Sequence, residues 1–286
     1  LAVAFVLAAA SGVAHADEPK DFIDDAKVFY RVVSCGNTAP VPADLDQATV
    51  DKHCAAMQKL YDTWHKTYAE PASKFFATLR PAGLPTTVVY PFGGGDLGSA
   101  LVTYPDARDI TTISLEHAGD PTRLAHLKKS QLRESLANYR AAIDGLLTLH
   151  DSTTENMLKL ESGGIPGQLS FHITGMTAMG YEPVSLKFFR LEDDGSIHYY
   201  TQAEIDALKA KKAKKIKSKW VDTDFSEAFN NMELTFRKAG DPKAPLIVHR
   251  HIAWNLANKA FKDSPLEKYL LAKGKVCAMT KAASYL

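Results

Sequence analysis

The stretch TTVVYPFGGGDLGSALVTYPDARDITTISLEHAG, residues Thr86–Gly119, decides the fold. It predicts a β-strand over Thr86–Phe92, a glycine-rich turn, a short helix, and a second strand over Ile110–Leu115 that is followed by Glu116. This order is typical of a βαβ unit with two parallel strands. Ligands of open α/β sheets bind at the carboxyl ends of such strands, so the same segment marks the first place to look for a pocket.

The rest of the chain predicts helices before this segment and antiparallel hairpins after it. In the helix expected over Asp46–Lys66, apolar side chains recur on one helical face. Two hairpins are expected, Pro183–Leu191 with Ser196–Thr201 and Met232–Lys238 with Leu246–Trp254. We therefore predict an α/β fold with a Rossmann-like βαβ start, a mixed sheet with antiparallel hairpins, and a helical N-terminal region.

Three further helix starts can be read from capping patterns. Asp120-Pro121 combines an acidic N-cap with proline at the first helical position, and one long helix or two consecutive helices are expected to follow. Ser152–Glu155 and Thr201–Glu204 match the capping box, in which a hydroxyl and a carboxylate satisfy backbone N–H groups at a helix start.

The first residues predict an export signal. Leu1–Ala14 is apolar except for Ser11, and the triplet AHA that ends at Ala16 matches a signal-peptidase site, so we expect cleavage after Ala16. The apolar run is shorter than the roughly 20 residues that a membrane-spanning helix needs. We therefore predict a secreted or periplasmic protein with no integral membrane segment in the mature chain.

These readings divide the chain into three parts. They are a signal-peptide fragment (residues 1–16), a helical N-terminal region (residues 17–85) and an α/β domain (residues 86–286). Lys275–Leu286 predicts a strand that runs into a helix which has just begun. We therefore expect the α/β domain to be incomplete at its C-terminus.

Charge and cysteine content narrow the class of protein. With 34 basic and 33 acidic residues the chain is almost neutral, which argues against nucleic acid or an anionic membrane as a partner. The lysine-rich run Lys209–Lys219 has no interleaved aromatic residues, so we interpret it as an exposed, solvated helix end. An oxidising compartment favours a disulfide between Cys35 and Cys54. Cys277 is then either a buried thiol or paired with a cysteine beyond Leu286.

The glycine-rich turn has three interpretations. Gly93, Gly95 and Gly98 satisfy the G-x-G-x-x-G spacing of a dinucleotide fold, and Glu116 stands at the distance of a ribose-binding acid. A tight structural turn and a pocket for some other ligand are the alternatives. The following helix is soon interrupted by Pro105, and exported proteins rarely meet free nucleotides, so the sequence assigns no particular cofactor.

Two groups of side chains could carry chemistry. Asp96 and Glu116 follow adjacent strands and form a candidate carboxylate pair for acid–base work, unless Asp96 only caps the short helix and Glu116 only faces water. His249 and His251 lie two apart on a strand, so both imidazoles are expected on one face as weak metal-ligand candidates, with His172 or Glu116 as a third ligand. The same histidine pair is alternatively the solvent face of a hairpin.

Three segments of the chain resemble a family of exported bacterial proteins of unassigned function. They are YPFGGGDLGSALVTYPDARDITTISLE, GYEPVSLKFFRLEDDGSIHYYT and KVCAMTKAASYL, and the resemblance covers Thr86–Leu286. Its marks are an Asp-containing turn (Gly93–Asp96), a Tyr-Pro-Asp-Ala step (Tyr104–Ala107) and a strand ending in Leu-Glu. The resemblance implies further sequence after Leu286. Many relatives have Ser-Gly-Pro-Asp in place of the glycine run, which shifts the interest from the glycines to Asp96.

These observations lead to two hypotheses for function. The first is a binding protein with a small-molecule, glycan or peptide pocket near the turn, formed by Gly93, Gly94, Gly95, Asp96 and Glu116. The second is an exported hydrolase or lyase that uses Asp96 and Glu116, with or without a metal at His249 and His251. The sequence lacks the signatures of serine hydrolases, zincins, NTPases and thioredoxins, and it does not determine an oligomeric state.

Overall fold

The computed structural model describes residues 18–148, 164–211 and 226–279. Its elements in chain order, with η marking π- or 3₁₀-helical segments, are α1 (Ile23–Val28), η1 (Phe29–Val33), α2 (Gln47–Trp64), η2 (His65–Ala69), α3 (Glu70–Leu79), β1 (Thr87–Pro91), α4 (Leu97–Thr103), β2 (Asp109–Ser114), η3 (Pro121–His126), α5 (Lys129–Thr148), α7 (Gly167–Ala178), β3 (Tyr181–Leu191), β4 (Ile197–Tyr199), α8 (Gln202–Ala210), η4 (Glu227–Phe229), β5 (Asn231–Lys238), β6 (Ile247–Ala253), α9 (Asn258–Phe261), α10 (Pro265–Ala272) and β7 (Cys277–Ala278).

The strands form one mixed sheet in the order β4-β3-β5-β6-β2-β1-β7, which confirms the predicted α/β class. β1 and β2 are parallel neighbours joined through α4, as the βαβ interpretation requires, and β2 also pairs in parallel with β6. Both predicted hairpins are present, because β3–β4 and β5–β6 pair antiparallel. The parallel and antiparallel halves therefore meet at β6, which pairs antiparallel with β5 and parallel with β2.

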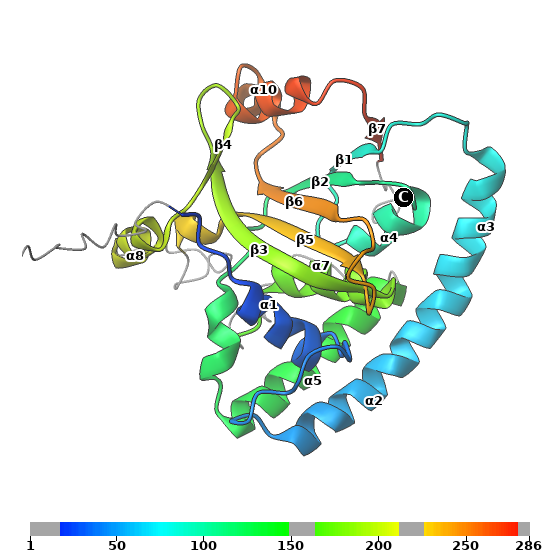
Figure 1. The fold of residues 1–286 in the computed structure, drawn as a ribbon, viewed down its shortest axis with the longest axis vertical. Coiled ribbons are helices and arrows are strands. Elements are labelled where there is room, and N and C mark those ends of the chain that lie inside the picture. Colours follow the sequence, from blue (N-terminus) through cyan, green and yellow to red (C-terminus); the bar gives the residue numbers. More distant parts are fainter. Residues whose placement is uncertain (1–17, 149–163, 212–225, 280–286) are drawn as a thin grey trace, which may run out of the picture.

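The two faces of the sheet are covered unequally (Figure 1). One face carries the larger core, to which α1, η1, α2, α4, α5 and α7 all contribute buried residues. The other face is covered chiefly by α10, where Leu266 and Tyr269 pack on Val89, Ile113 and Ile252 from the parallel strands. Because α1, η1 and α2 share this core with the sheet, they pack on the face that carries the larger core, whereas α3 has no buried residue.

Alternation along β6 assigns its side chains to these two faces. His249 and His251 are fully buried on the side of α7, whereas Arg250 points to the side of α10 and pairs with Glu233 at 2.7 Å and Asp109 at 3.3 Å. The alternative that the histidine pair faces solvent is therefore wrong. One face of a hairpin strand is exposed to solvent only where no other element packs on it, and here α7 packs on this face of β6.

Capping explains several of the observed helix starts. The capping box at Thr201 and Glu204 opens α8 as predicted. Asp120 caps a short 3₁₀ segment, η3, and α5 then begins separately at Lys129, so two consecutive helices follow the Asp-Pro start. The predicted Ser152–Glu155 box, like the export signal, lies outside the described residues. Of the lysine-rich run, Lys209 and Lys211 are described and exposed, while residues 212–219 lie outside.

The predicted disulfide between Cys35 and Cys54 is present, and of the two alternatives for Cys277 the structure has the buried thiol. The sulfur atoms of Cys35 and Cys54 are 2.15 Å apart, which is bonding distance, and their Cα atoms are 5.2 Å apart. The bond ties the segment after η1 to the middle of α2. Cys277 is a buried free thiol on β7, where its Sγ lies 3.5 Å from the Pro85 carbonyl oxygen. Among the described residues, no helix is long and apolar enough to cross a membrane.

Candidate functional site

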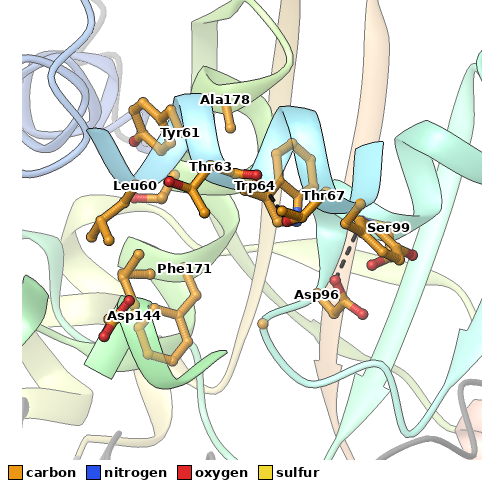
Figure 2. Close-up of a pocket in the computed structure, with 16 residues that line it drawn as sticks. Leu60, Tyr61, Thr63, Trp64, Thr67, Asp96, Ser99, Asp144, Phe171 and Ala178 are labelled. Carbon is orange, nitrogen blue, oxygen red and sulfur yellow. Dashed lines mark hydrogen bonds between the residues drawn. The ribbon is translucent and has the colours of Figure 1, made fainter. Parts of the chain in front are cut away.

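A cavity of about 380 Å³ lies among α2, η2, α4, α5 and α7, and we call it the α2–α7 cavity (Figure 2). A volume of this size is typical of sites for small molecules. Its lining combines aromatic rings, hydroxyl groups, two carboxylates and small residues. The lining residues are Leu60, Tyr61, Thr63, Trp64, Thr67, Tyr68, Gly95, Asp96, Gly98, Ser99, Ile143, Asp144, Phe171, Thr174, Gly175 and Ala178.

The predicted glycine turn forms part of the wall of this cavity. Gly95 and Asp96 line it directly, whereas Gly93 and Gly94 belong to the same turn but are not among the lining residues. A Cβ added at Gly95 would meet the Cβ of Phe171 at 2.5 Å, so only glycine lets the turn pack this closely on α7. Gly94 has a φ of +47°, the left-handed region that favours glycine. Close packing at Gly95 and a left-handed backbone at Gly94 are the features of a tight structural turn beside a pocket.

The third glycine of the spacing, Gly98, serves helix packing. A Cβ on Gly98 would meet Trp64 at 3.3 Å, and a Cβ on the facing Gly175 would meet the Gly98 backbone nitrogen at 2.8 Å. This pair therefore lets the backbones of α4 and α7 come into contact. The G-x-G-x-x-G spacing is explained by packing on Phe171 and Trp64, which supports the structural interpretation over the dinucleotide one.

Asp96 has a defined hydrogen-bond arrangement. Its Oδ1 accepts from the Ser99 backbone N–H at 3.3 Å, which makes it the N-cap of α4, and its Oδ2 accepts from the Tyr90 hydroxyl at 3.2 Å. Burial of Tyr90, together with the nearby charge of Asp96, raises the pKa of that phenol, so Tyr90 remains the donor. The carboxylate is therefore held in place while it forms part of the cavity wall.

Glu116 follows β2 as predicted but lies outside the lining of the cavity. Its Oε2 accepts from Nε2 of Gln168 on α7 at 3.4 Å, and its backbone carbonyl accepts from Nε2 of His251 at 2.8 Å. The structure thus associates Glu116 with the histidines of β6, and Asp96 with the aromatic residues of α2 and α7. The predicted pairing of the two carboxylates in one pocket has no support in this arrangement.

The histidine pair of β6 joins a third buried imidazole. The ring of His172 on α7 lies 4.3 Å from that of His249 and 5.2 Å from that of His251, measured between centroids. Thr112 bridges the β6 pair, with its Oγ1 2.9 Å from His249 Nε2 and 3.4 Å from His251 Nδ1. His251 Nε2 donates to the Glu116 carbonyl, and because burial keeps this ring neutral its Nδ1 is then the acceptor.

This histidine cluster, His172, His249 and His251, is an electrically neutral core. Burial lowers the pKa of all three imidazoles, to about 4 for His251 and well below the ordinary value for the other two. Both ring nitrogens of His172 and Nδ1 of His249 lack a hydrogen-bond partner among the described residues. Within the same residues no group of three or more His, Cys, Asp or Glu side chains is arranged to hold a metal ion. The rings lie close together, but the described residues give no arrangement that could hold a metal ion.

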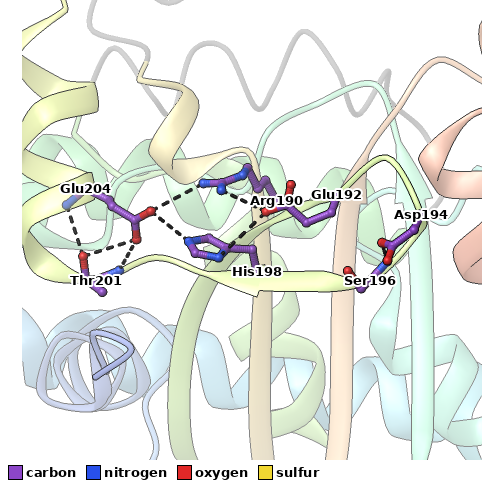
Figure 3. A network of polar contacts seen from close by, with 7 residues as sticks. All are labelled: Arg190, Glu192, Asp194, Ser196, His198, Thr201 and Glu204. Atoms are coloured by element: carbon purple, nitrogen blue, oxygen red, sulfur yellow. Dashed lines mark hydrogen bonds and ion pairs between the residues drawn. The ribbon is translucent and has the colours of Figure 1, made fainter. Parts of the chain in front are cut away.

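A second polar cluster lies at the edge of the sheet that is formed by β4 (Figure 3). Glu204 accepts from the backbone N–H of Thr201 and pairs with His198 at 2.8 Å and Arg190 at 3.6 Å. The backbone hydrogen bond is the main reason why the pKa of Glu204 lies below its ordinary value. Arg190 also pairs with Glu192 at 2.9 Å. These charges neutralise one another and fasten α8 to the β3–β4 hairpin, so we assign the cluster a structural role.

Comparison of the chain with protein-family models, curated proteins and solved structures found no match. Any function therefore has to be argued from the site itself. Sequence reasoning located one wall of the cavity, the Gly95–Asp96 turn, but missed Trp64, Asp144 and Phe171 on three different helices. Their sequence separation from the turn left no local signal that could have found them.

Proposed function

We propose that the protein is exported and that it binds a small molecule in the α2–α7 cavity. The observation that carries this proposal is the lining, in which Tyr61, Trp64, Tyr68 and Phe171 surround a volume of about 380 Å³ beside the Asp96 carboxylate. Such a combination of apolar walls and a few fixed polar groups is characteristic of ligand sites. The apolar leader sequence and the disulfide support export.

A hydrolase or lyase that uses Asp96 with Glu116 receives less support. Acid–base catalysis needs both groups within reach of one substrate. Asp96 lines the cavity, whereas Glu116 is hydrogen-bonded to Gln168 and lies outside the lining. We therefore place the protein with binding proteins.

A screen of compounds from several chemical classes tests whether the cavity is a ligand site. A mixed library of amines, sugars, amino acids and aromatic acids is screened by ligand-observed NMR against the wild type and against Thr67→Trp, which places an indole over the cavity. Thr67 is an exposed helical residue whose hydroxyl donates to the Thr63 carbonyl. The matched control is Thr78→Trp on α3, where an equally exposed threonine donates to the Phe75 carbonyl and does not line the cavity.

We expect at least one compound that binds the wild type and Thr78→Trp but not Thr67→Trp. If every compound that binds does so equally to all three proteins, or if none binds, the cavity is not a ligand site. Thermal unfolding of both variants verifies that the fold is kept. Because both substitutions are at exposed positions, we expect the melting temperatures to remain close to that of the wild type.

A further inference from the structure

Resting on the proposed ligand site, we propose that the α2–α7 cavity takes an uncharged aromatic molecule of one or two rings. The first reason is the size of the site. Its volume of about 380 Å³ lies near the lower end of the range of roughly 300–1,000 Å³ for ligand pockets, so the occupant is small. Thr63, Thr67 and Asp144 of the lining are exposed, so the cavity can be reached from solvent.

The second reason is the aromatic lining. Tyr61, Trp64 and Tyr68 belong to the continuous stretch of α2 and η2. A fourth ring, that of Phe171, comes from α7 on another side of the cavity (Figure 2). Aromatic rings that pack offset or edge-to-face gain free energy beyond the burial of their area, and a saturated ring or an aliphatic chain lacks this gain. Four rings in the lining of one small volume therefore favour an aromatic occupant.

Three of these rings are held in place by the protein itself. The Tyr61 hydroxyl donates to the Ser34 carbonyl at 2.9 Å. Trp64 packs on Gly98, where an added Cβ would lie 3.3 Å from the indole ring. The ring centroids of Trp64 and Tyr68 are 5.9 Å apart, with an angle of 36° between the ring planes. Side chains that are ordered before binding lower the entropic cost of holding a ligand.

The third reason is the charge of the lining, which favours neither an anion nor a cation. No lysine, arginine or histidine is among the described lining residues, so an anionic ligand would lie beside carboxylates without a counter-charge. The carboxylates are not free to pair with a cation. Asp96 accepts from the Tyr90 hydroxyl at 3.2 Å and from the Ser99 backbone N–H at 3.3 Å, and Asp144 has interactions of its own. A neutral ligand avoids the cost of taking an unpaired charge out of water.

The hydroxyl groups of the lining disfavour a sugar. Thr63 donates to the Lys59 carbonyl at 2.9 Å, and Thr67 donates to the Thr63 carbonyl at 2.8 Å. Together with the Tyr61 hydroxyl, these donors are used within the protein. A sugar needs donors as well as acceptors, and no Asn, Gln or Arg side chain is among the described lining residues. Indole or phenol has a single donor, which a hydroxyl oxygen of the lining can accept.

The experiment is calorimetric titration with indole and phenol, with cyclohexanol, indole-3-acetate, tryptamine and glucose as matched probes. We expect indole and phenol to bind and glucose not to bind. Cyclohexanol keeps the hydroxyl of phenol but is not aromatic, so it should bind at least about threefold more weakly than phenol. Indole-3-acetate should bind at least about tenfold more weakly than indole, because its carboxylate finds no cation. Tryptamine should bind within about threefold of indole, because its ammonium group can remain in solvent.

Substitutions at Tyr68 test whether the rings of the lining hold the ligand. Tyr68→Leu removes one ring and should weaken the binding of indole about two- to tenfold. Tyr68→Phe keeps the ring and should leave the affinity unchanged. The matched control is Phe75→Leu, which removes an exposed ring of α3 outside the described lining and should also leave the affinity unchanged. Tyr68 is half-buried, so we expect these variants to fold, and thermal unfolding verifies this.

The outcomes separate this inference from the proposed function. If a sugar, amine or acid binds in a manner that Thr67→Trp abolishes, while indole and phenol do not bind, the cavity is a ligand site but the aromatic assignment is wrong. Equal affinities of phenol and cyclohexanol, or of Tyr68→Leu and the wild type for indole, also reject the assignment. Binding of indole-3-acetate or tryptamine that is tenfold tighter than that of indole rejects an uncharged ligand. If no compound, indole and phenol included, is sensitive to Thr67→Trp, both proposals fail.

Discussion

We expect mild acid to lower the free energy of unfolding of this protein, because its fold buries histidine side chains in their neutral form. His53 and His251 have pKa values of about 4 in the fold, since burial disfavours the charged imidazole. His53 donates to the Val33 carbonyl and faces the Arg140 guanidinium at 2.9 Å, so a proton on its Nδ1 would place two cations together. In the unfolded chain a histidine titrates near its ordinary pKa of roughly 6.5.

The sign and size of the effect follow from linkage. Each histidine with a lowered pKa contributes stability that is fully present above about pH 6.5 and is lost as the pH falls toward 4. Between pH 7.5 and 5.5, one histidine with a folded pKa of about 4 costs about 1.4 kcal/mol, and by pH 4.5 about 2.5 kcal/mol. His172 and His249 have pKa values lowered in the same direction, so they add losses of the same sign.

By pH 4.5 the losses of His53 and His251 together, about 5 kcal/mol, reach the lower end of the total free energy of unfolding of a typical domain, about 5–15 kcal/mol. Carboxylates change their contribution to stability mostly at lower pH. Asp46 and Glu204, whose pKa values lie below the ordinary one, lose their contribution mainly under pH 4.5. The interval from pH 7.5 to 5.5 therefore isolates the histidines.

Urea unfolding followed by circular dichroism at both pH values measures the effect, with His172→Leu as the diagnostic variant. Both nitrogens of His172 lack partners among the described residues, so we expect leucine to preserve stability at pH 7.5 and to reduce the acid loss. Met176→Leu, buried on the same helix, should keep the full acid loss. Equal losses in the two variants, or a wild type that is as stable at pH 5.5 as at 7.5, would refute the reasoning.

Two further predictions concern the scaffold. Replacing Cys35 and Cys54 by alanine should lower the free energy of unfolding by about 3 kcal/mol, because the disulfide closes a loop with a sequence separation of 19. Chemical denaturation measures this loss, with the reduced wild type as the control. Unchanged stability of the variant would contradict the prediction. Gly95→Ala should destabilise the protein by about 1–3 kcal/mol, because the added Cβ would clash with Phe171. Gly94→Ala should destabilise it less, because its Cβ meets nothing within 4 Å and the only cost is the left-handed backbone conformation. The reverse order in thermal unfolding would show that the turn is loosely packed.

Local patterns predicted the strands well. The alternation and β-branched residues of Thr86–Phe92 and Ile110–Leu115 correspond to β1 and β2 within one residue at each end, and both hairpins formed where turn residues separate apolar runs. α7 was missed. It is buried on nearly all sides, so Gly167–Ala178 has no polar face and therefore no helical periodicity to detect.

The ligand site could be predicted only in part, for a different reason. Asp96 stands at the end of a strand, and its position after a glycine turn is a local signal. The other walls come from α2, α5 and α7, and only tertiary packing brings Trp64, Asp144 and Phe171 to the turn. Likewise, the spacing of His249 and His251 predicts a shared face, and His172 was one of two candidates to join them, but nothing in the sequence indicates that α7 covers that face.

A crystal structure of the protein grown with an excess of a compound that binds the wild type but not Thr67→Trp tests the central claim most directly. We expect electron density for this compound in the α2–α7 cavity, in contact with Trp64 or Phe171. The compound bound elsewhere on the surface, with the cavity holding only solvent at a saturating concentration, would contradict the claim.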